Sequence, residues 1–294
     1  MIKKSFLLLL VFSFLNIAQS KLDKHRKIIF PDIPGYKTLK CDFHEHTVFS
    51  DGHVWPTIRV MEAVKDNLDA IAVTEHLEYQ PHKDDIPHPD RNRAYNIETK
   101  ASENDSLIII NGSEITRSMP PGHSNAIFVK DANKLIIDDP MEVFEEAKRQ
   151  GAFVFWNHPN WIKQRKDGIA TLTDMHKKLI QERLLNGIEV VNEDTYSDEA
   201  LQIALDNNLT MVGNSDIHGL IDWQYNVPEG GHRPVTLVFA KERSEDAIKE
   251  ALENIFQIGI VSVKTRITKR GKIAIVKLSA EDSAEDIGMR IGIF

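Results

Sequence analysis

Short apolar runs alternate with amphipathic stretches along most of the chain. From Thr38 onward, eight such runs have the length of buried strands, and several are separated by segments whose apolar residues recur every three or four positions. Strands that alternate with helices are typical of an α/β fold built on a mostly parallel sheet or barrel. The pattern predicts strands over 38–43, 70–74, 107–111, 126–129, 153–156, 187–191, 210–212 and 235–240, and helices over 56–67, 141–150, 175–186, 198–207 and 244–253.

The regions outside this pattern divide the chain of 294 residues into four parts. Residues 1–20 form a candidate signal peptide, 21–37 a linker, 38–253 the main domain, and 254–294 a short tail with β-like pieces at 258–263 and 272–278. The tail is too small for a second domain of useful size. Within the main domain, the proline-containing and charged segment 78–93 is expected to be a surface excursion.

The first twenty residues have the composition of an export signal. Lys3 and Lys4 precede an apolar run over residues 6–15, and Ala18-Gln19-Ser20 gives the small-x-small pattern of a signal peptidase site. We therefore expect cleavage after Ser20 and export to the periplasm or the cell exterior, with no membrane span afterwards. The alternative is a buried N-terminal helix or a membrane anchor, but the run is shorter than the ~20 residues that a span needs.

Composition and charge narrow the possible classes of protein. Hydrophobic residues at 41% and charged residues at 27% are ordinary globular values, which excludes a largely disordered, collagenous or polytopic membrane chain. The formal net charge is −8, and loss of two lysines with the signal peptide makes it −10. Nucleic acid is not an expected partner, because binding to its backbone normally needs a basic surface. The single cysteine, Cys41, lies in an apolar strand and is expected to be a buried structural thiol.

Side chains that can bind metal follow five of the predicted strands. His44 and His46 follow the first strand, and they point to the same side because side chains alternate in an extended segment. The carboxyl ends of parallel strands meet at one edge, where α/β barrels place their chemistry. The side chains at these five strand ends are His44, His46, Asp51, His76, Glu114, His158, Asp216 and His218.

His123 is the exception, because Gly122-His123 comes before its strand. Pro120 and Pro121 stiffen that approach and Gly122 allows close packing, so we expect a fixed ligand there too.

Together these are six histidines and three carboxylates, more than a single ion needs. A mixed nitrogen and oxygen set without cysteine suits zinc, manganese or iron, so we expect two to three divalent ions. Two bare dications about 3.5 Å apart repel by roughly 19 kcal/mol at an effective dielectric near 20. Anions must therefore lie between them, and Glu114 is a natural bridge.

At this point the motifs resemble those of the polymerase and histidinol phosphatase (PHP) domain family of metal-dependent phosphoesterases. The resemblance runs from His44 to about Ala251, and it rests on H-x-H-T-x-x-S-D-G, T-E-H, G-S-E, G-H, N-H-P and D-x-H in family order. It implies a distorted (β/α)7 barrel with, typically, three metal ions at the strand ends.

The resemblance also implies an assignment of the ligands. One ion would be held by His44, His46, Glu114 and Asp216, a second by Glu114, His123 and His158, and a third by Asp51, His76 and His218. Glu114 would bridge, and Glu114, Asp216 and His218 are the expected catalytic residues.

The expected function is hydrolysis of a small-molecule phosphoester by a metal-bridging hydroxide that attacks phosphorus. We favour phosphodiesters, because aromatic residues close to the ligand motifs could pack against a second ester group: Trp156, Trp161, Trp223 and Tyr225. Arg117, His232 and Arg233 are candidate contacts for the substrate phosphate. The alternatives are a phosphomonoesterase of the same family, an amidohydrolase-like hydrolase, and a secreted metal-binding module without turnover.

Overall fold

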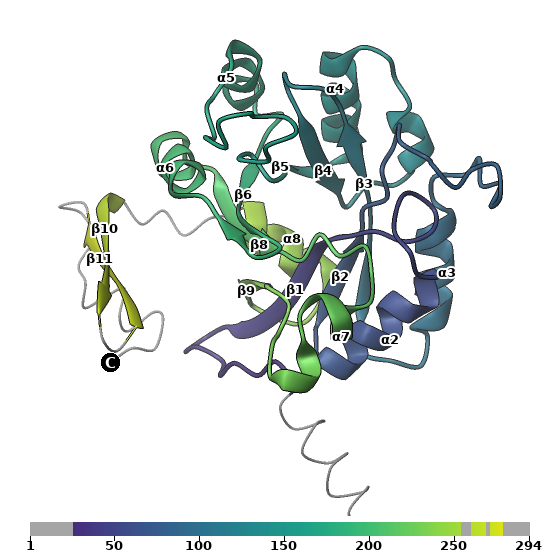
Figure 1. Cartoon of the computed structure of the whole chain (residues 1–294), viewed down its shortest axis with the longest axis horizontal. Coiled ribbons are helices and arrows are strands. Elements are labelled where there is room, and N and C mark those ends of the chain that lie inside the picture. The colour runs from purple at the N-terminus through teal and green to yellow at the C-terminus, as the bar shows by residue number, and fades with distance from the viewer. Residues whose placement is uncertain (1–25, 254–259, 269–270, 279–294) are drawn as a thin grey trace, which may run out of the picture.

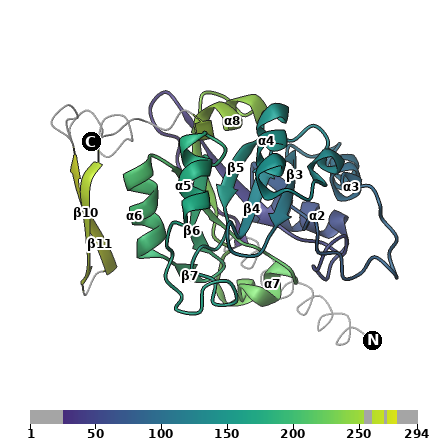
Figure 2. The same ribbon diagram turned by 90° about the horizontal axis from the view of Figure 1, so that it is seen from above.

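The computed structural model describes residues 26–253, 260–268 and 271–278. The predicted signal peptide and part of the tail lie outside these residues. Within them, no helix has the length and hydropathy needed to cross a membrane. The described chain forms a curled sheet with helices packed around it and a separate hairpin (Figure 1; Figure 2).

The main sheet contains nine strands, of which eight follow one another in the spatial order β7-β6-β5-β4-β3-β2-β1-β9, while β8 pairs with β6. Their bounds are β1 (Lys37–Glu45), β2 (Ala70–Val73), β3 (Ile108–Thr116), β4 (His123–Ile127), β5 (Phe153–Trp156), β6 (Gly187–Asn192), β7 (Thr195–Tyr196), β8 (Thr210–Asn214) and β9 (Thr236–Ala240).

Strand direction departs from simple β/α alternation at three places, and one of them is β7, which is antiparallel to β6. The pairs β1–β2, β2–β3, β5–β6 and β6–β8 are parallel, whereas β4 is antiparallel to both β3 and β5, and β9 is antiparallel to β1. Because β3 leads into β4 without a helix, the expected count of seven β/α units is not confirmed. The expected curled α/β sheet of barrel type is present.

Side-chain hydrogen bonds connect the two ends of the curled sheet. The backbone N–H of Gly213 in β8 donates to Thr236 Oγ1 in β9 (3.0 Å), and the N–H of Phe43 in β1 donates to Asn214 Oδ1 (3.0 Å). Both acceptors are buried, so these bonds are shielded from water. They bring the end of β8 beside β1.

The helices are α2 (Pro56–Asp66), α3 (Arg93–Ala101), α4 (Pro140–Gln150), α5 (Asp174–Gln181), α6 (Asp198–Asn207), α7 (Ile221–Gln224) and α8 (Glu245–Glu253), with 3-10 turns η1 (Ala132–Leu135) and η2 (Val227–Glu229). The five predicted helices are confirmed, but α5 ends five residues early. Arg183 takes a left-handed conformation (φ 54°) there, and Leu184 and Leu185 then turn into the core. The pattern did not predict α3, which buries only Ala94 and Glu98.

The helix ends follow local rules, as α4 illustrates. The Asp139 side chain accepts hydrogen bonds from the N–H groups of Met141 and Glu142, and Pro140 occupies the first turn, where no donor is needed. Gly151 ends the helix at φ 82°, a conformation that glycine adopts without strain.

The apolar core has three main parts. Helices α2 and α3 pack on the outside of β2 and β3, while α4, α5 and α6 pack on the outside of β4 to β6. The third part fills the barrel interior, where Phe43, Ile110 and Phe155 belong to one apolar cluster with Ile248 and other residues of α8. Because Ala240 at the end of β9 pairs with Lys37 at the start of β1, α8 closes the barrel at the amino end of β1. Cys41 is fully buried in this interior, as predicted.

The tail contributes β10 (Ile260–Thr268) and β11 (Gly271–Leu278), an antiparallel hairpin that forms a sheet of its own. Both β-like pieces predicted in the tail therefore overlap strands.

Candidate metal centre

The parallel strands deliver their ligand side chains to one edge of the sheet. His46 follows β1, His76 follows β2, His158 follows β5, and Asp216 and His218 follow β8. His123, the exception in the sequence, is the first residue of β4 and pairs with Thr116 at the end of β3. Because β4 is antiparallel, its beginning lies where its neighbours end. All nine predicted ligands therefore lie at the same edge.

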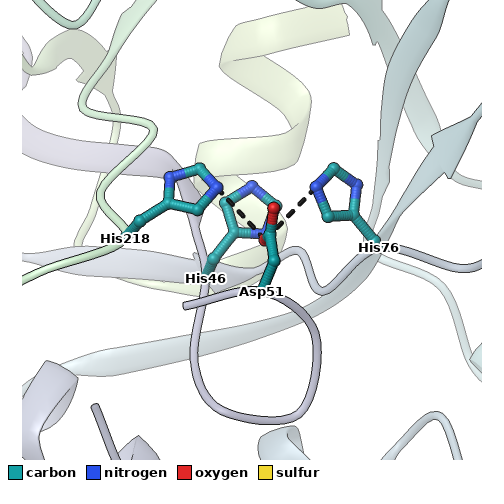
Figure 3. Close-up of side chains that lie close together, drawn as sticks. All are labelled: His46, Asp51, His76 and His218. Atoms are coloured by element: carbon teal, nitrogen blue, oxygen red, sulfur yellow. Dashed lines mark ion pairs between the residues drawn. The ribbon is translucent and has the colours of Figure 1, made fainter. Parts of the chain in front are cut away.

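One group of ligands surrounds Asp51 and is named here the Asp51 group: His46, Asp51, His76 and His218 (Figure 3). Asp51 Oδ1 lies 3.1 Å from His218 Nε2, 3.3 Å from His76 Nε2 and 3.8 Å from His46 Nδ1. One carboxylate oxygen thus faces three imidazoles, a spacing at which a single ion could contact all four side chains.

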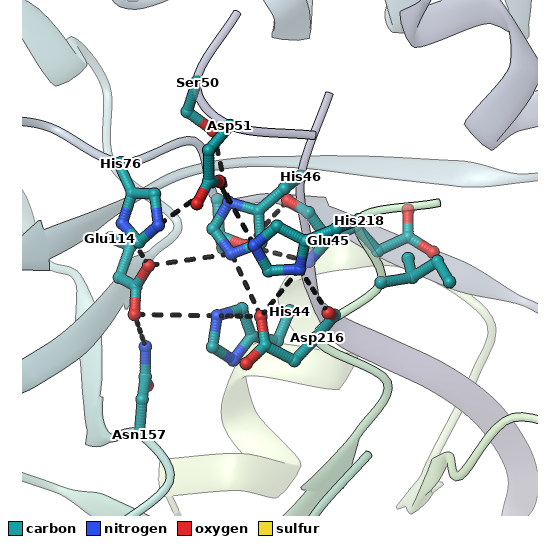
Figure 4. A network of polar contacts seen from close by, with 12 residues as sticks. His44, Glu45, His46, Ser50, Asp51, His76, Glu114, Asn157, Asp216 and His218 are labelled. Carbon is teal, nitrogen blue, oxygen red and sulfur yellow. Dashed lines mark hydrogen bonds and ion pairs between the residues drawn. The ribbon is translucent and has the colours of Figure 1, made fainter. Parts of the chain in front are cut away.

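A second group centres on Asp216. Its Oδ1 lies 3.1 Å from Nε2 of both His44 and His46. Glu114 contributes to the same group, with Oε1 3.7 Å from His44 Nε2 and Oε2 3.6 Å from His46 Nε2 (Figure 4). These are the four residues expected around the first ion.

Glu114 also faces a third group, formed with His123, His158 and His76. Its Oε1 lies 3.1 Å from His123 Nδ1 and 3.4 Å from His158 Nε2, and its Oε2 lies 2.6 Å from His76 Nδ1. The carboxylate is fully buried between the groups. Its two oxygens are placed as a bridge between ions requires.

The buried polar atoms of the cluster test whether a metal fits. Five atoms that face the other ligands are buried without a hydrogen-bond partner: His44 Nε2, His46 Nε2, Asp51 Oδ1, Glu114 Oε2 and Asp216 Oδ1. A buried polar atom without a partner is costly, and proteins rarely leave one so. The five atoms lie close together, and each is an imidazole nitrogen or a carboxylate oxygen. Zinc, manganese and iron bind such donor atoms. The residues therefore fit divalent ions.

The ionisable side chains of the cluster shift one another's pKa values. Burial alone would raise the pKa of Asp216, but His44 and His46 hold it well below its usual range. Burial and the neighbouring His218 and His76 lower the pKa of His46 to about 3. His46 is therefore neutral at pH 7, as a ligand must be.

The other two histidines of the Asp51 group behave differently. Burial would lower the pKa of His76, yet Glu114 and Asp51 raise it to about 10. Burial likewise opposes protonation of His218, but Asp51 and Asp216 raise its pKa to about 9. An ion that binds here must displace both protons, so metal affinity falls as pH falls.

Glu189 in β6 is a supporting residue that the sequence analysis missed. Its Oε1 accepts from His44 Nδ1 at 2.8 Å, and its Oε2 accepts the backbone N–H of His158 at 2.8 Å. A carboxylate behind an imidazole fixes which ring nitrogen faces the metal. The signal was a lone charged residue inside the apolar run Gly187-Ile188-Glu189-Val190-Val191.

Asn157 of the N-H-P motif supports the central carboxylate. Its Nδ2 donates to Glu114 Oε1 (2.8 Å) and to Asn125 Oδ1 (2.8 Å). All three side chains are fully or almost fully buried, so the amide holds the carboxylate of Glu114 in one orientation.

The loop that carries Asp51 is held by Glu75 of the T-E-H motif. Glu75 accepts the backbone N–H of Thr47 (3.0 Å) and the hydroxyl groups of Thr47 and Ser50. A Cβ at Gly52 would lie 2.6 Å from the His46 carbonyl carbon, so only glycine fits this tight turn.

The expected substrate contacts lie outside the ligand cluster. Arg117 Nε pairs with Glu78 (2.8 Å), and the rest of its guanidinium donates to backbone carbonyls. Arg233 is buried and pairs with Asp42, Glu45 and Asp66. His232 is exposed. Both guanidinium groups thus have structural partners, and a role toward substrate stays a prediction.

Of the four aromatic residues suggested as an apolar wall, Trp161 lies against the cluster. Its ring centroid is 5.6 Å from that of His123 and 5.0 Å from that of His158. Trp156 is fully buried and stacks on His176 instead, and Trp223 is 78% exposed on α7.

A pocket of about 380 Å³ opens beside His123. Its other walls come from the segment that connects β3 to β4 and from the segment after β5: Thr116, Arg117, Ser118, Met119, Lys163 and Gln164. The pocket therefore adjoins the metal centre and is large enough for part of a small molecule.

Comparison with known proteins identifies proteins that share this architecture. No family model matches the chain. A two-domain protein from Bacteroides vulgatus that contains a predicted PHP-like metal-dependent phosphoesterase is similar at 49% identity and a TM-score of 0.76, over 85% of this chain and 68% of that one. A protein from Bifidobacterium adolescentis shares the fold at 17% identity and a TM-score of 0.50, over 72% of this chain and 95% of that one.

A second similarity covers one fifth of the chain. A 61-residue segment is 39% identical to the large ribosomal subunit protein uL23 of Methanosphaera stadtmanae and spans 71% of that protein. The uL23 protein of Thermoplasma acidophilum is 42% identical over 60 residues. The chain therefore belongs, over most of its length, to the PHP-like metal-dependent phosphoesterases, and its 61-residue segment belongs to the uL23 family.

Proposed function

We propose that this protein hydrolyses phosphoesters with two to three divalent ions bound at the carboxyl edge of its barrel, and that it prefers phosphodiesters. The observation that carries the proposal is the position of Glu114. Its two buried oxygens face different groups of ligands, and unpartnered donor atoms surround it.

The charge of the site supports an anionic substrate. Asp51, Glu114 and Asp216 supply three negative charges, whereas two to three dications supply four to six positive charges. The loaded site is therefore positive inside a chain whose formal net charge is −8. The bound ions would activate a water molecule and neutralise the phosphate oxygens.

The residues of the chain have separate roles in this proposal. Glu189 holds the imidazole of His44, and Asn157 holds the carboxylate of Glu114. Such fixed donors lower the cost of reorganising the site during reaction. Trp161 packs against the rings of His123 and His158 on one side.

The pocket beside His123 supports the preference for diesters. A diester carries a second organic arm that a monoester lacks, and this arm needs space next to the ions. The pocket provides that space, with Trp161 near its edge. Zinc, manganese and iron are the proposed metals, and the N-terminal segment supports export of the mature enzyme.

The decisive experiment compares hydrolysis of a matched pair, an aryl phosphate monoester and the corresponding diester, by protein reconstituted with each metal. We expect a higher kcat/KM for the diester. A monoester preference of tenfold or more would replace the phosphodiesterase proposal by a phosphatase. Activity on amides or lactones alone would favour an amidohydrolase, and no turnover with any metal would favour a metal-binding module.

The uL23-related segment supports a second, independent candidate function, association with the large ribosomal subunit. The observation behind it is identity of about 40% across most of the length of uL23. Co-sedimentation of the protein with purified large subunits, with and without excess uL23 as competitor, tests this candidate. Failure to sediment would remove it and leave the phosphoesterase proposal untouched.

A further inference from the structure

Arg59 in α2 is a fully buried arginine with every donor used. Its Nε donates to the carbonyl of His46 (3.0 Å). Its Nη1 donates to Glu62 Oε2 (2.7 Å) and to the carbonyl of Gly219 (2.7 Å), and its Nη2 donates to the carbonyls of Ile217 (3.2 Å) and His218 (3.0 Å). A guanidinium has five N–H donors, so none is left over.

The carbonyls that Arg59 binds belong to two segments that carry metal ligands. One is the end of β1, with His46, and the other is the D-x-H segment after β8. Direct backbone bonds join the same segments, from His46 N–H to the carbonyl of Ile217 (3.0 Å) and from His53 N–H to the carbonyl of His218 (2.8 Å). Arg59 therefore reinforces a junction between segments about 170 residues apart in the chain.

The buried charge of Arg59 is compensated locally. Glu62 pairs with it one turn along α2, and the second oxygen of Glu62 accepts the backbone N–H of Ile221 at the start of α7 (2.8 Å). The pair thus extends the junction to the residues that follow the D-x-H segment. A buried ion pair of this kind is weak evidence for stability but fixes geometry well.

The contacts of Arg59 favour one part of the metal centre. The Asp51 group contains His46, Asp51, His76 and His218, and Arg59 holds the backbone of two of these four residues. The Asp216 group shares His46, so Arg59 holds the backbone of one of its four residues. Arg59 holds none of the third group, which consists of Glu114, His76, His123 and His158. Displacement of the junction should therefore disturb the Asp51 group first.

We propose that Arg59 is a positioning residue for the Asp51 group and sets whether an ion is held there. This inference rests on the metal-binding part of the proposed function. Residues behind the ligands of a metal site commonly change metal affinity by about 10–100-fold when they are altered. A lysine cannot replace Arg59, because all three of its N–H donors are on one nitrogen atom. They cannot reach four carbonyls that lie in different directions.

The test measures bound metal per protein after gel filtration, together with the melting temperature, in four variants. Arg59→Lys removes the guanidinium with its five donors, and Asp51→Asn removes the central carboxylate of the Asp51 group. The double variant combines both changes. Arg243→Lys is the matched control, because Arg243 also pairs with a carboxylate, Asp69, but is partly exposed and contacts no ligand segment.

We expect Arg59→Lys to lose one equivalent of metal, with about 10–100-fold weaker binding of that ion, while Arg243→Lys keeps the wild-type content. The double variant should lose no more metal than Asp51→Asn alone, because both changes affect the same ion. Retention of all ions by Arg59→Lys would overturn the inference, and so would an additional ion lost in the double variant.

A second variant covers the case in which Arg59→Lys does not fold. Glu62→Gln keeps an acceptor for Ile221 but weakens the partner of Arg59, so we expect weaker binding of the same single ion. Unchanged metal affinity in Glu62→Gln would then overturn the inference. If the variants show this pattern of metal loss but wild-type protein hydrolyses no phosphoester, the proposed function fails and the role of Arg59 stands.

Discussion

His176 in α5 connects the stability of the fold to pH through a single buried ring. The side chain is 1% exposed and stacks on Trp156, with ring centroids 3.9 Å apart. Its Nε2 donates to the carbonyl of Pro121 (2.6 Å), and its Nδ1 accepts the backbone N–H of Thr173 (3.2 Å). This pattern requires the neutral ring, because a proton on Nδ1 would face the N–H of Thr173. Burial lowers the pKa of His176 to about 4.

The low pKa of His176 makes the free energy of unfolding depend on pH. An unfolded histidine has a pKa of about 6.5, so between pH 6.5 and 4 the unfolded chain binds more protons than the folded one. The free energy of unfolding therefore falls as pH falls through this window. At pH 5 the loss from His176 is about 2 kcal/mol relative to pH 7, and below pH 4 it approaches about 3 kcal/mol.

Urea unfolding of wild type and His176→Gln, at pH 7 and pH 5 in the presence of a chelator, measures this effect. Other titrating groups are common to both proteins and cancel in the comparison. We expect the stability advantage of wild type over the variant to shrink by about 2 kcal/mol between pH 7 and pH 5. An advantage that stays constant within 0.5 kcal/mol, roughly the additivity limit of such comparisons, would refute the reasoning.

Three further predictions concern the metal centre. Purified protein should contain two to three transition-metal ions per chain and lose hydrolysis on chelation; full activity in a chelator with no metal by elemental analysis would refute this. Glu114→Gln should lower both metal content and kcat, because loss of the bridging charge leaves the ions unscreened; elemental analysis beside kinetics checks it, and full occupancy with most activity kept would argue against the bridge. Glu189→Gln should weaken binding of the ion at His44 by about 10–100-fold, measured by competition with a metal indicator; wild-type affinity would show that the carboxylate does not orient the ring.

The metal ligands could be predicted because each carries a local signal. His44 and His46 follow an apolar run directly, and the parallel arrangement of the strands brings such residues to one edge. The direction of β4 carried no such signal. The first apolar run ended at residue 111 and the next began at residue 126, whereas β3 continues through Glu114 to Thr116 and β4 begins at His123. The connection between the two strands is therefore shorter than the pattern indicated. The short connection left between them is too short for a parallel crossover.

Unlike Glu189, which interrupts an apolar run, the two buried arginines Arg59 and Arg233 could not be placed from the sequence. Arg59 lies in an amphipathic helix, where an arginine is normally exposed, and only the tertiary fold shows that it is buried. Arg233, a predicted substrate contact, is buried among three carboxylates, because spacing along the chain does not reveal which face of a loop turns inward. Helix α3 is polar along most of its surface and packs by a narrow stripe, which periodicity alone detects poorly.

The antiparallel β4 has a consequence for how such a protein can diversify. Glu114 and His123 lie on the two arms of one hairpin, held in register by the pairs from Gly112 with Ile127 to Thr116 with His123. The residues at the tip of this hairpin, 117–122, contain no metal ligand but line much of the pocket beside His123. Under the proposed function, the ladder would separate a constant part, which holds the ions, from a replaceable part, which faces the pocket beside His123. Exchange of six residues could redirect substrate choice while the ions stay in place.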